Sequence, residues 1–161
     1  MKTNNNATSR ILTLLLSAVI LALAGHPACA GDQVPFQGRA EGAIASVSPD
    51  PAGVVLTVRA HGNATLLGQF SREEVVLFNP VTGTLTGNVV FTAANGAQLF
   101  GTVAGGFTSA TTVTGTYTFT GGTGRFTNAS GSAAFNLSTP DGTHFSVEFT
   151  GSVSSVGSNK K

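Results

Sequence analysis

The chain has 161 residues, only 9% of them charged, and a formal net charge of +1 at pH 7. This length fits a single domain. So few basic residues exclude the clustered Lys and Arg that phosphate-backbone binding requires, so no nucleic-acid partner is expected.

The first 30 residues have the pattern of an export signal. Lys2 and Arg10 give a positive start, and an apolar run follows over residues 11–24. That run is shorter than the roughly 20 residues of a transmembrane helix. Ala28-Cys29-Ala30 matches a signal-peptidase site. We therefore predict a signal peptide over residues 1–30 and a secreted, periplasmic or cell-envelope location. A membrane anchor and lipid attachment at Cys29 are the alternatives.

Cleavage after Ala30 would change the chemistry open to the mature chain. It would remove the one cysteine and two of the eight basic residues, so that seven acidic residues give a net charge near −1. Disulfides, thiolate metal sites and cysteine catalysis would then be excluded. Two histidines without a carboxylate cluster argue against a metal site. We expect no metal, no cofactor and no membrane span in the mature form.

The remaining chain has β-sheet composition and reads as eight short strands. Thr, Val and Gly are abundant, and all eleven Phe follow residue 31,. Asn95-Gly96 favours a type I′ hairpin turn, because both residues tolerate positive φ. The polar residues 154–161 predict a disordered tail. The predicted strands cover residues 34–47, 54–61, 64–78, 84–93, 97–107, 112–120, 125–137 and 143–153, and the third is predicted to bend near residues 71–73. The predicted turns between strands include Gly62-Asn63 and Gly121–Gly124.

Apolar residues alternate with Thr, Ser, Asn and Gln along most of these strands, which indicates a sheet buried on one face. Glycine recurs on the apolar face, which favours strong coiling and leaves room for neighbouring Phe rings. We therefore predict one all-β domain over residues 31–153, a closed eight-stranded antiparallel barrel. An open two-sheet sandwich is the alternative. Phe78 and Phe100 fall on the opposite face and predict a subunit interface,.

One glycine-rich stretch carries a resemblance to known proteins. The residues Gly121, Gly122, Thr123, Gly124, Phe126, Ala129 and Gly131 resemble the dirigent proteins of the allene oxide cyclase-like barrel superfamily. The segments 64–70, 91–96 and 122–131 are also similar to uncharacterised exported bacterial proteins of that type. In that group the third position of the first segment is often His, whereas this chain has Leu66. The resemblance implies a barrel with an apolar lumen that shapes a small molecule, and it transfers no catalytic residue.

The candidate site residues follow from the apolar face and the glycine turn. Tyr117 is the one hydroxyl-bearing aromatic there, and a buried phenol needs a partner. Arg125, beside the turn, either bonds loop carbonyls or gates a lumen. The predicted ligand-binding residues are Phe91, Tyr117, Phe119, Phe135 and Phe149. The predicted structural residues of the turn are Gly121, Gly122, Gly124, Arg125, Phe126 and Gly131.

Other polar groups are assigned to the solvated outer face. Arg39 and Glu41 share a face of the first strand, and Arg59 and His61 share one of the second. An acid–base or anion site is the functional alternative to surface ion pairs.

Three functions remain open at this point. The first is a non-catalytic binder of a small apolar ligand, with no catalytic residue. The second is an interaction protein of the cell envelope, which could be a homo-oligomer. The third is a cofactor-independent cyclase or dirigent-type protein that steers a substrate by shape. Whether the protein is an enzyme is undecided from the sequence.

Overall fold

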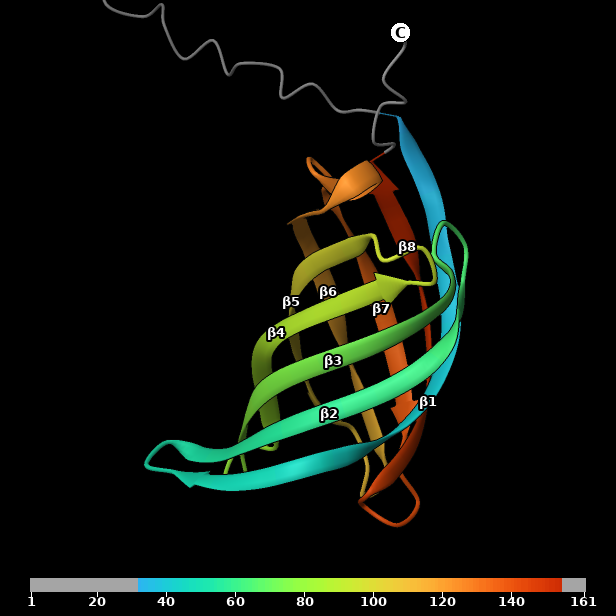
Figure 1. Ribbon diagram of the computed structural model, residues 1–161. Coiled ribbons are helices and arrows are strands. Elements are labelled where there is room, and N and C mark those ends of the chain that lie inside the picture. The colour runs from blue at the N-terminus through green and yellow to red at the C-terminus, as the bar shows by residue number, and fades with distance from the viewer. Residues whose placement is uncertain (1–31, 155–161) are drawn as a thin grey trace, which may run out of the picture.

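Eight antiparallel strands form a closed barrel in the computed structural model, which describes residues 32–154 (Figure 1). Each strand pairs with the next along the chain, and β8 pairs with β1 to close the barrel. The predicted fold class is confirmed. The predicted signal peptide and residues 155–161 of the predicted tail lie outside the described residues. The strands are β1 (Gln33–Asp50), β2 (Gly53–Ala64), β3 (Gly68–Asn79), β4 (Thr84–Ala93), β5 (Gln98–Phe107), β6 (Thr112–Gly122), β7 (Gly131–Ser138) and β8 (His144–Ser154).

The barrel has two different ends, which we call the plugged end and the mouth. The plugged end carries the β2–β3 and β4–β5 turns and the short 3-10 helix η1 (Gly124–Phe126), which is seen in orange at the top of the barrel in Figure 1. The mouth carries the other four turns. There the β1–β2 hairpin extends past the barrel, because β1 pairs with β8 only as far as Ala43 but with β2 as far as Asp50. Among the described residues, no helix is long and apolar enough to cross a membrane.

The turn between β2 and β3 is not at Gly62-Asn63 as predicted. Both residues continue the β2–β3 ladder, and the chain reverses only after Ala64. The chain reverses direction at Leu66, which has a backbone φ of 66°. Residues other than Gly rarely adopt a positive φ. The Thr65 hydroxyl accepts a hydrogen bond from the Gln37 N–H at 2.9 Å, which holds this turn against β1.

The Asn95-Gly96 hairpin is confirmed, but its turn type is not. Gly96 has a φ of 80°, whereas Asn95 keeps a negative φ, so the turn is not type I′,. The Gly96 N–H donates to the Ala93 carbonyl at 2.8 Å, and the Asn95 side chain accepts from the Ala97 N–H at 3.1 Å. A longer loop with one left-handed residue therefore joins β4 to β5.

The predicted seventh strand begins too early. Residues 124–126 form η1, and pairing with β6 and β8 starts only at Gly131. Positive φ values at Gly121 (142°) and Gly124 (57°) turn the chain across the plugged end,. Phe126 is 2% exposed there, so its ring closes this end of the core.

The half of the core next to the plugged end is filled by aromatic rings. Ring centroids in this cluster lie 5.1–6.1 Å apart, mostly in edge-to-face contacts,. Its five members are Phe36, Phe70, Phe91, Phe119 and Phe149, all buried. This aromatic cluster leaves the other half of the barrel, toward the mouth, as the place where a cavity can form.

Candidate functional site

An apolar cavity of about 280 Å³ occupies the mouth half of the barrel. Its wall comes from the inward-facing positions of all eight strands, which the two-residue period places on one face. Lining residues include Leu56, Val76, Phe78, Val103, Phe107 and Leu137. Phe107 is 42% exposed, so apolar surface continues from the cavity to the rim of the mouth.

Close backbone contact shapes the wall on the side of β5, β6 and β7. Gly105 and Gly115 pair across β5 and β6, and Phe135 follows on β7. A Cβ atom added to Gly115 would lie 2.7 Å from the tip of the Phe135 ring. The Phe135 ring occupies that space and stacks on Tyr117, with centroids 4.7 Å apart. The predicted use of glycine to make room for Phe rings is confirmed here.

Three polar side chains form the floor of the cavity, which we call the polar floor: Arg72, Glu74 and Tyr117. Arg72 Nη1 donates to the Tyr117 hydroxyl oxygen at 2.6 Å, and Arg72 Nε lies 3.2 Å from Glu74 Oε1. The Arg72 and Glu74 side chains are 0% and 8% exposed. Glu74 and Tyr117 line the cavity, whereas the guanidinium lies between the Tyr117 and Phe145 rings.

The polar floor keeps hydrogen-bonding capacity that the described residues do not use. Arg72 Nε, Arg72 Nη2 and Glu74 Oε1 are buried and have no hydrogen-bond partner among residues 32–154. Buried polar atoms are normally paired, because leaving one unpaired costs about 1–3 kcal/mol. Glu74 and Tyr117 face the cavity, and a few polar groups placed in an otherwise apolar cavity are a feature of binding sites,.

Burial also fixes the protonation state of Tyr117. Loss of solvent raises the pKa of its phenol far above the usual value of 10.0, and the nearby Arg72 opposes this only in part,. The hydroxyl therefore stays protonated at physiological pH. It accepts from Arg72, and the neighbouring Glu74 carboxylate also favours the protonated phenol and raises its pKa.

The structure divides the five predicted ligand-binding residues. Tyr117 and Phe135 line the cavity. Phe91, Phe119 and Phe149 belong instead to the aromatic cluster beneath the polar floor, where each is at most 2% exposed. Ligand contact by any of the five stays a prediction.

The sequence reasoning missed Arg72 and Glu74. We expected a bend near residues 71–73 and assigned Phe78 to the outer face. β3 instead runs straight through, so that Phe70, Arg72, Glu74, Val76 and Phe78 all point inward. The residue types gave no clear signal, because Arg72 and Glu74 are charged at inward positions whereas the apolar Val75 faces outward,.

The residues of the glycine turn, for which a structural role is predicted, lie at the plugged end. Arg125 donates from Nη2 to the Leu66 carbonyl and lies over the Phe126 ring, 4.9 Å from its centroid. This contact joins η1 to the β2–β3 turn. It lies at the plugged end, far from the mouth, so the geometry gives Arg125 no gating position over the cavity.

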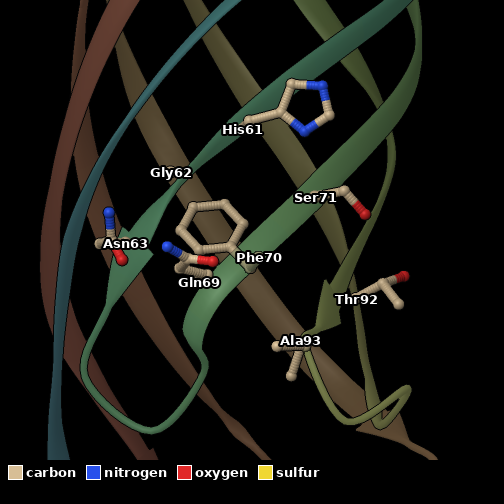
Figure 2. A pocket seen from close by; sticks show the side chains of 9 residues that line it. His61, Gly62, Asn63, Gln69, Phe70, Ser71, Thr92 and Ala93 are labelled. Atoms are coloured by element: carbon tan, nitrogen blue, oxygen red, sulfur yellow. The ribbon is translucent and has the colours of Figure 1, made fainter.

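A larger hollow of about 520 Å³ lies on the outer surface of β2, β3 and β4 (Figure 2). His61, Ser71 and Thr92 are cross-strand neighbours there. In Figure 2 their side chains point outward and not into the barrel. His61 and Ser71 are exposed, and the hollow contains no buried polar group comparable to the polar floor. We therefore take the smaller cavity as the candidate site.

The outer charged residues behave as surface groups. Arg39, Glu41, Arg59 and His61 are all exposed. Arg59 Nε forms an exposed ion pair with Glu73 Oε2 at 3.2 Å. Among the described residues, no three His, Cys, Asp or Glu side chains gather in a way that could hold a metal ion.

Comparisons with known proteins identify the fold. The chain is similar to the structure of the pterocarpan synthase dirigent protein GePTS1, with a TM-score of 0.62 and 13% identity over 88% of this chain and 100% of that one. It is also similar to the pterocarpan synthase dirigent protein PsPTS1, with a TM-score of 0.59 and 14% identity over 79% and 97%. No family model and no curated protein matches the sequence. The protein therefore has a dirigent-type barrel fold, in agreement with the resemblance seen in the sequence.

Proposed function

We propose that this protein binds a small apolar molecule in the cavity at the mouth of its barrel. The observation that carries the proposal is the contrast between the two halves of the core. Five Phe rings fill one half, whereas the other retains about 280 Å³ lined almost entirely by apolar side chains. This volume is close to the lower end of the roughly 300–1,000 Å³ typical of small-molecule sites.

Titration with the neutral fluorescent probe N-phenyl-1-naphthylamine tests this binding. Saturable fluorescence enhancement at one site per chain is expected. Leu85→Trp should abolish it, because Leu85 is half-buried in the cavity wall and a larger ring would fill the space. Val75→Trp is the matched control, because Val75 is 47% exposed on the outer face of the neighbouring strand. Equal binding by both variants would contradict a site in the cavity.

Native mass spectrometry of the protein purified from its own host's envelope fraction would identify the natural ligand. A bound mass that is lost on denaturation is expected. The same spectra give the number of subunits, and so test the predicted homo-oligomer. A chain that carries no small molecule would direct attention to the envelope-interaction alternative. Of the two aromatic residues predicted to form its interface, Phe78 faces the cavity and is not available on the outer surface. Phe100 is half-buried and remains the candidate.

A second candidate function is a cofactor-independent cyclase or isomerase. Two observations favour it: Glu74 and Tyr117 bring polar groups into an otherwise apolar cavity, and both similar structures are named as synthases. The extracted ligand would be incubated with fresh protein and followed by NMR. A change in its structure that Tyr117→Phe abolishes would support an enzyme, and a ligand recovered unchanged would support a binding protein.

Action outside the cytoplasm is part of the same proposal and rests on the predicted signal peptide. Cell fractionation and N-terminal sequencing of the mature protein test it. A first residue of Gly31 is expected, and an intact Met1 in the cytoplasmic fraction would contradict export.

A further inference from the structure

We propose that the ligand of this cavity is an uncharged molecule whose apolar body ends in a group that both donates and accepts hydrogen bonds, such as a hydroxyl or a primary amide. This inference rests on the proposed binding function. It adds the chemistry of the part of the ligand that meets the polar floor.

The charge of the site argues for a neutral ligand. Arg72 and Glu74 carry opposite charges on groups 3.2 Å apart, and Glu74 is the one charged side chain in the cavity lining. The pair is therefore balanced and leaves no excess charge for a carboxylate or an ammonium group. An ionic ligand would lose its hydration without gaining a counter-ion, which is strongly unfavourable.

The unpaired polar atoms argue for a polar end on the ligand. Glu74 lines the cavity, and its Oε1 accepts no hydrogen bond from residues 32–154, although Arg72 Nε lies 3.2 Å from it as an ion-pair partner. The Tyr117 hydroxyl accepts from Arg72 and carries its proton beside the Glu74 carboxylate, where a ligand group can also accept it. A ligand group that donates to the Glu74 carboxylate and accepts from the Tyr117 hydroxyl would pair with both floor residues that line the cavity. A pure hydrocarbon would leave these groups unpaired.

The order of residues along β3 gives the orientation of the ligand. Phe78 and Val76 lie nearer the mouth than Glu74, and Phe70 lies beyond the polar floor in the aromatic cluster. The polar end therefore enters first and reaches Glu74. The apolar body then lies along Val76 and Phe78, whose ring contacts Phe107 at the rim, with Leu137 of β7 on the opposite wall.

A panel of ten-carbon ligands that differ only in the end group tests this inference. Displacement of bound N-phenyl-1-naphthylamine would be measured for 1-decanol, decanamide, methyl decyl ether, sodium decanoate and decylamine hydrochloride. The alcohol and the amide should bind at least tenfold more tightly than the two ions. They should also bind at least several-fold more tightly than the ether, which accepts a hydrogen bond but cannot donate one to Glu74.

Glu74→Gln should change this selectivity in a defined direction. The substitution keeps the shape of the side chain but leaves the Arg72 charge without its counter-ion, so decanoate should bind at least tenfold more tightly than to the natural protein. Glu73→Gln is the matched control, because Glu73 is the next residue along β3 and points outward, with 55% of its side chain exposed. It should leave the order of affinities unchanged. If Glu74→Gln does not fold, the panel on the natural protein decides alone.

The outcomes separate the two levels of the proposal. Tight binding of the alcohol and amide, with weak binding of the ions and ether, supports the inference. Equal displacement by all five compounds would overturn the polar-end requirement but leave binding of an apolar molecule intact. Failure of the probe and of every compound to bind would overturn the proposed function, and this inference with it.

Discussion

Arg72 and Tyr117 meet across the middle of the barrel, with the guanidinium Nη1 donating to the phenol oxygen at 2.6 Å. The two residues are 1–2% exposed and come from strands on different sides of the core. Their contact separates the aromatic cluster of the plugged end from the cavity at the mouth. The boundary between a filled and an open half of the barrel is therefore a hydrogen bond between two side chains.

Removal of the Tyr117 hydroxyl should destabilise the fold. Tyr117→Phe keeps the stacked ring but leaves Arg72 Nη1 without an acceptor in a buried position. We expect a loss of about 1–3 kcal/mol in the free energy of unfolding, measured by urea denaturation. Thr116→Val, on the exposed outer face of β6, should change it by less than about 0.5 kcal/mol,. Equal stability of the two variants would contradict a paired role for the hydroxyl.

Removal of one partner from the Arg72–Glu74 pair should cost more than removal of both. Arg72→Met leaves the largely buried Glu74 carboxylate without its counter-ion, and breaking such a pair costs about 3–5 kcal/mol,. The double variant Arg72→Met, Glu74→Leu replaces both charges by apolar side chains of similar size. It should recover most of that loss in chemical denaturation. A double variant as unstable as the single one would mean that the pair is not coupled.

Gly115 should be intolerant of a side chain. A Cβ atom there would lie 2.3 Å from the Ala104 carbonyl oxygen and 2.7 Å from the Phe135 ring tip, so Phe135 would have to move against Tyr117. We expect Gly115→Ala to cost about 3 kcal/mol and to weaken binding of an apolar probe. At Gly106 the nearest atom would be 3.1 Å away. Gly106→Ala should therefore cost at most about 1 kcal/mol, and thermal unfolding of the two variants compares them.

Asp141 should titrate well below an ordinary aspartate. The His144 ring, and then the Thr143 and His144 N–H groups, bond its carboxylate and lower its pKa from 3.8 to about 2. Because the folded-state pKa is lowered, its contribution to stability is fully present above about pH 4 and is lost as the pH falls through about 2. Carboxyl ¹³C NMR titration measures this directly. His144→Asn should raise the pKa, whereas His61→Asn should leave it unchanged; a pKa near 3.8 in the natural protein would contradict the prediction.

Most of the fold could be predicted from the sequence, because inward-facing apolar residues recur at every second position along the strands. Phe91, Tyr117, Phe135 and Phe149 alternate with Thr, Ser and Asn, and all four face inward. The turn positions were less predictable. The β2–β3 reversal depends on Leu66 in a left-handed conformation, for which its residue type gives no signal. η1 depends on Phe126 finding space at the plugged end, which is a tertiary effect.

The site was harder to predict than the fold for a specific physical reason. Arg72 and Glu74 are charged, and isolated charges are almost never fully buried. Their sequence positions therefore favoured a surface bend over a continuous strand. Only the pairing of the two charges, together with the Tyr117 hydroxyl across the barrel, makes their inward position tolerable. That pairing depends on three-dimensional contacts, since β3 and β6 are not neighbours in the sheet.

The single seam between β1 and β8 has a consequence for how the chain folds. Each of the other seven strand pairs joins consecutive strands, so these seven hairpins can form one after another from local contacts. The seam instead joins Phe36 to Gly151, from opposite ends of the domain, and its loop-closure entropy is the largest in the barrel,. We therefore expect seam closure to be the slow step of folding. Until it closes, β1 and β8 each present an unpaired edge on which another chain can add.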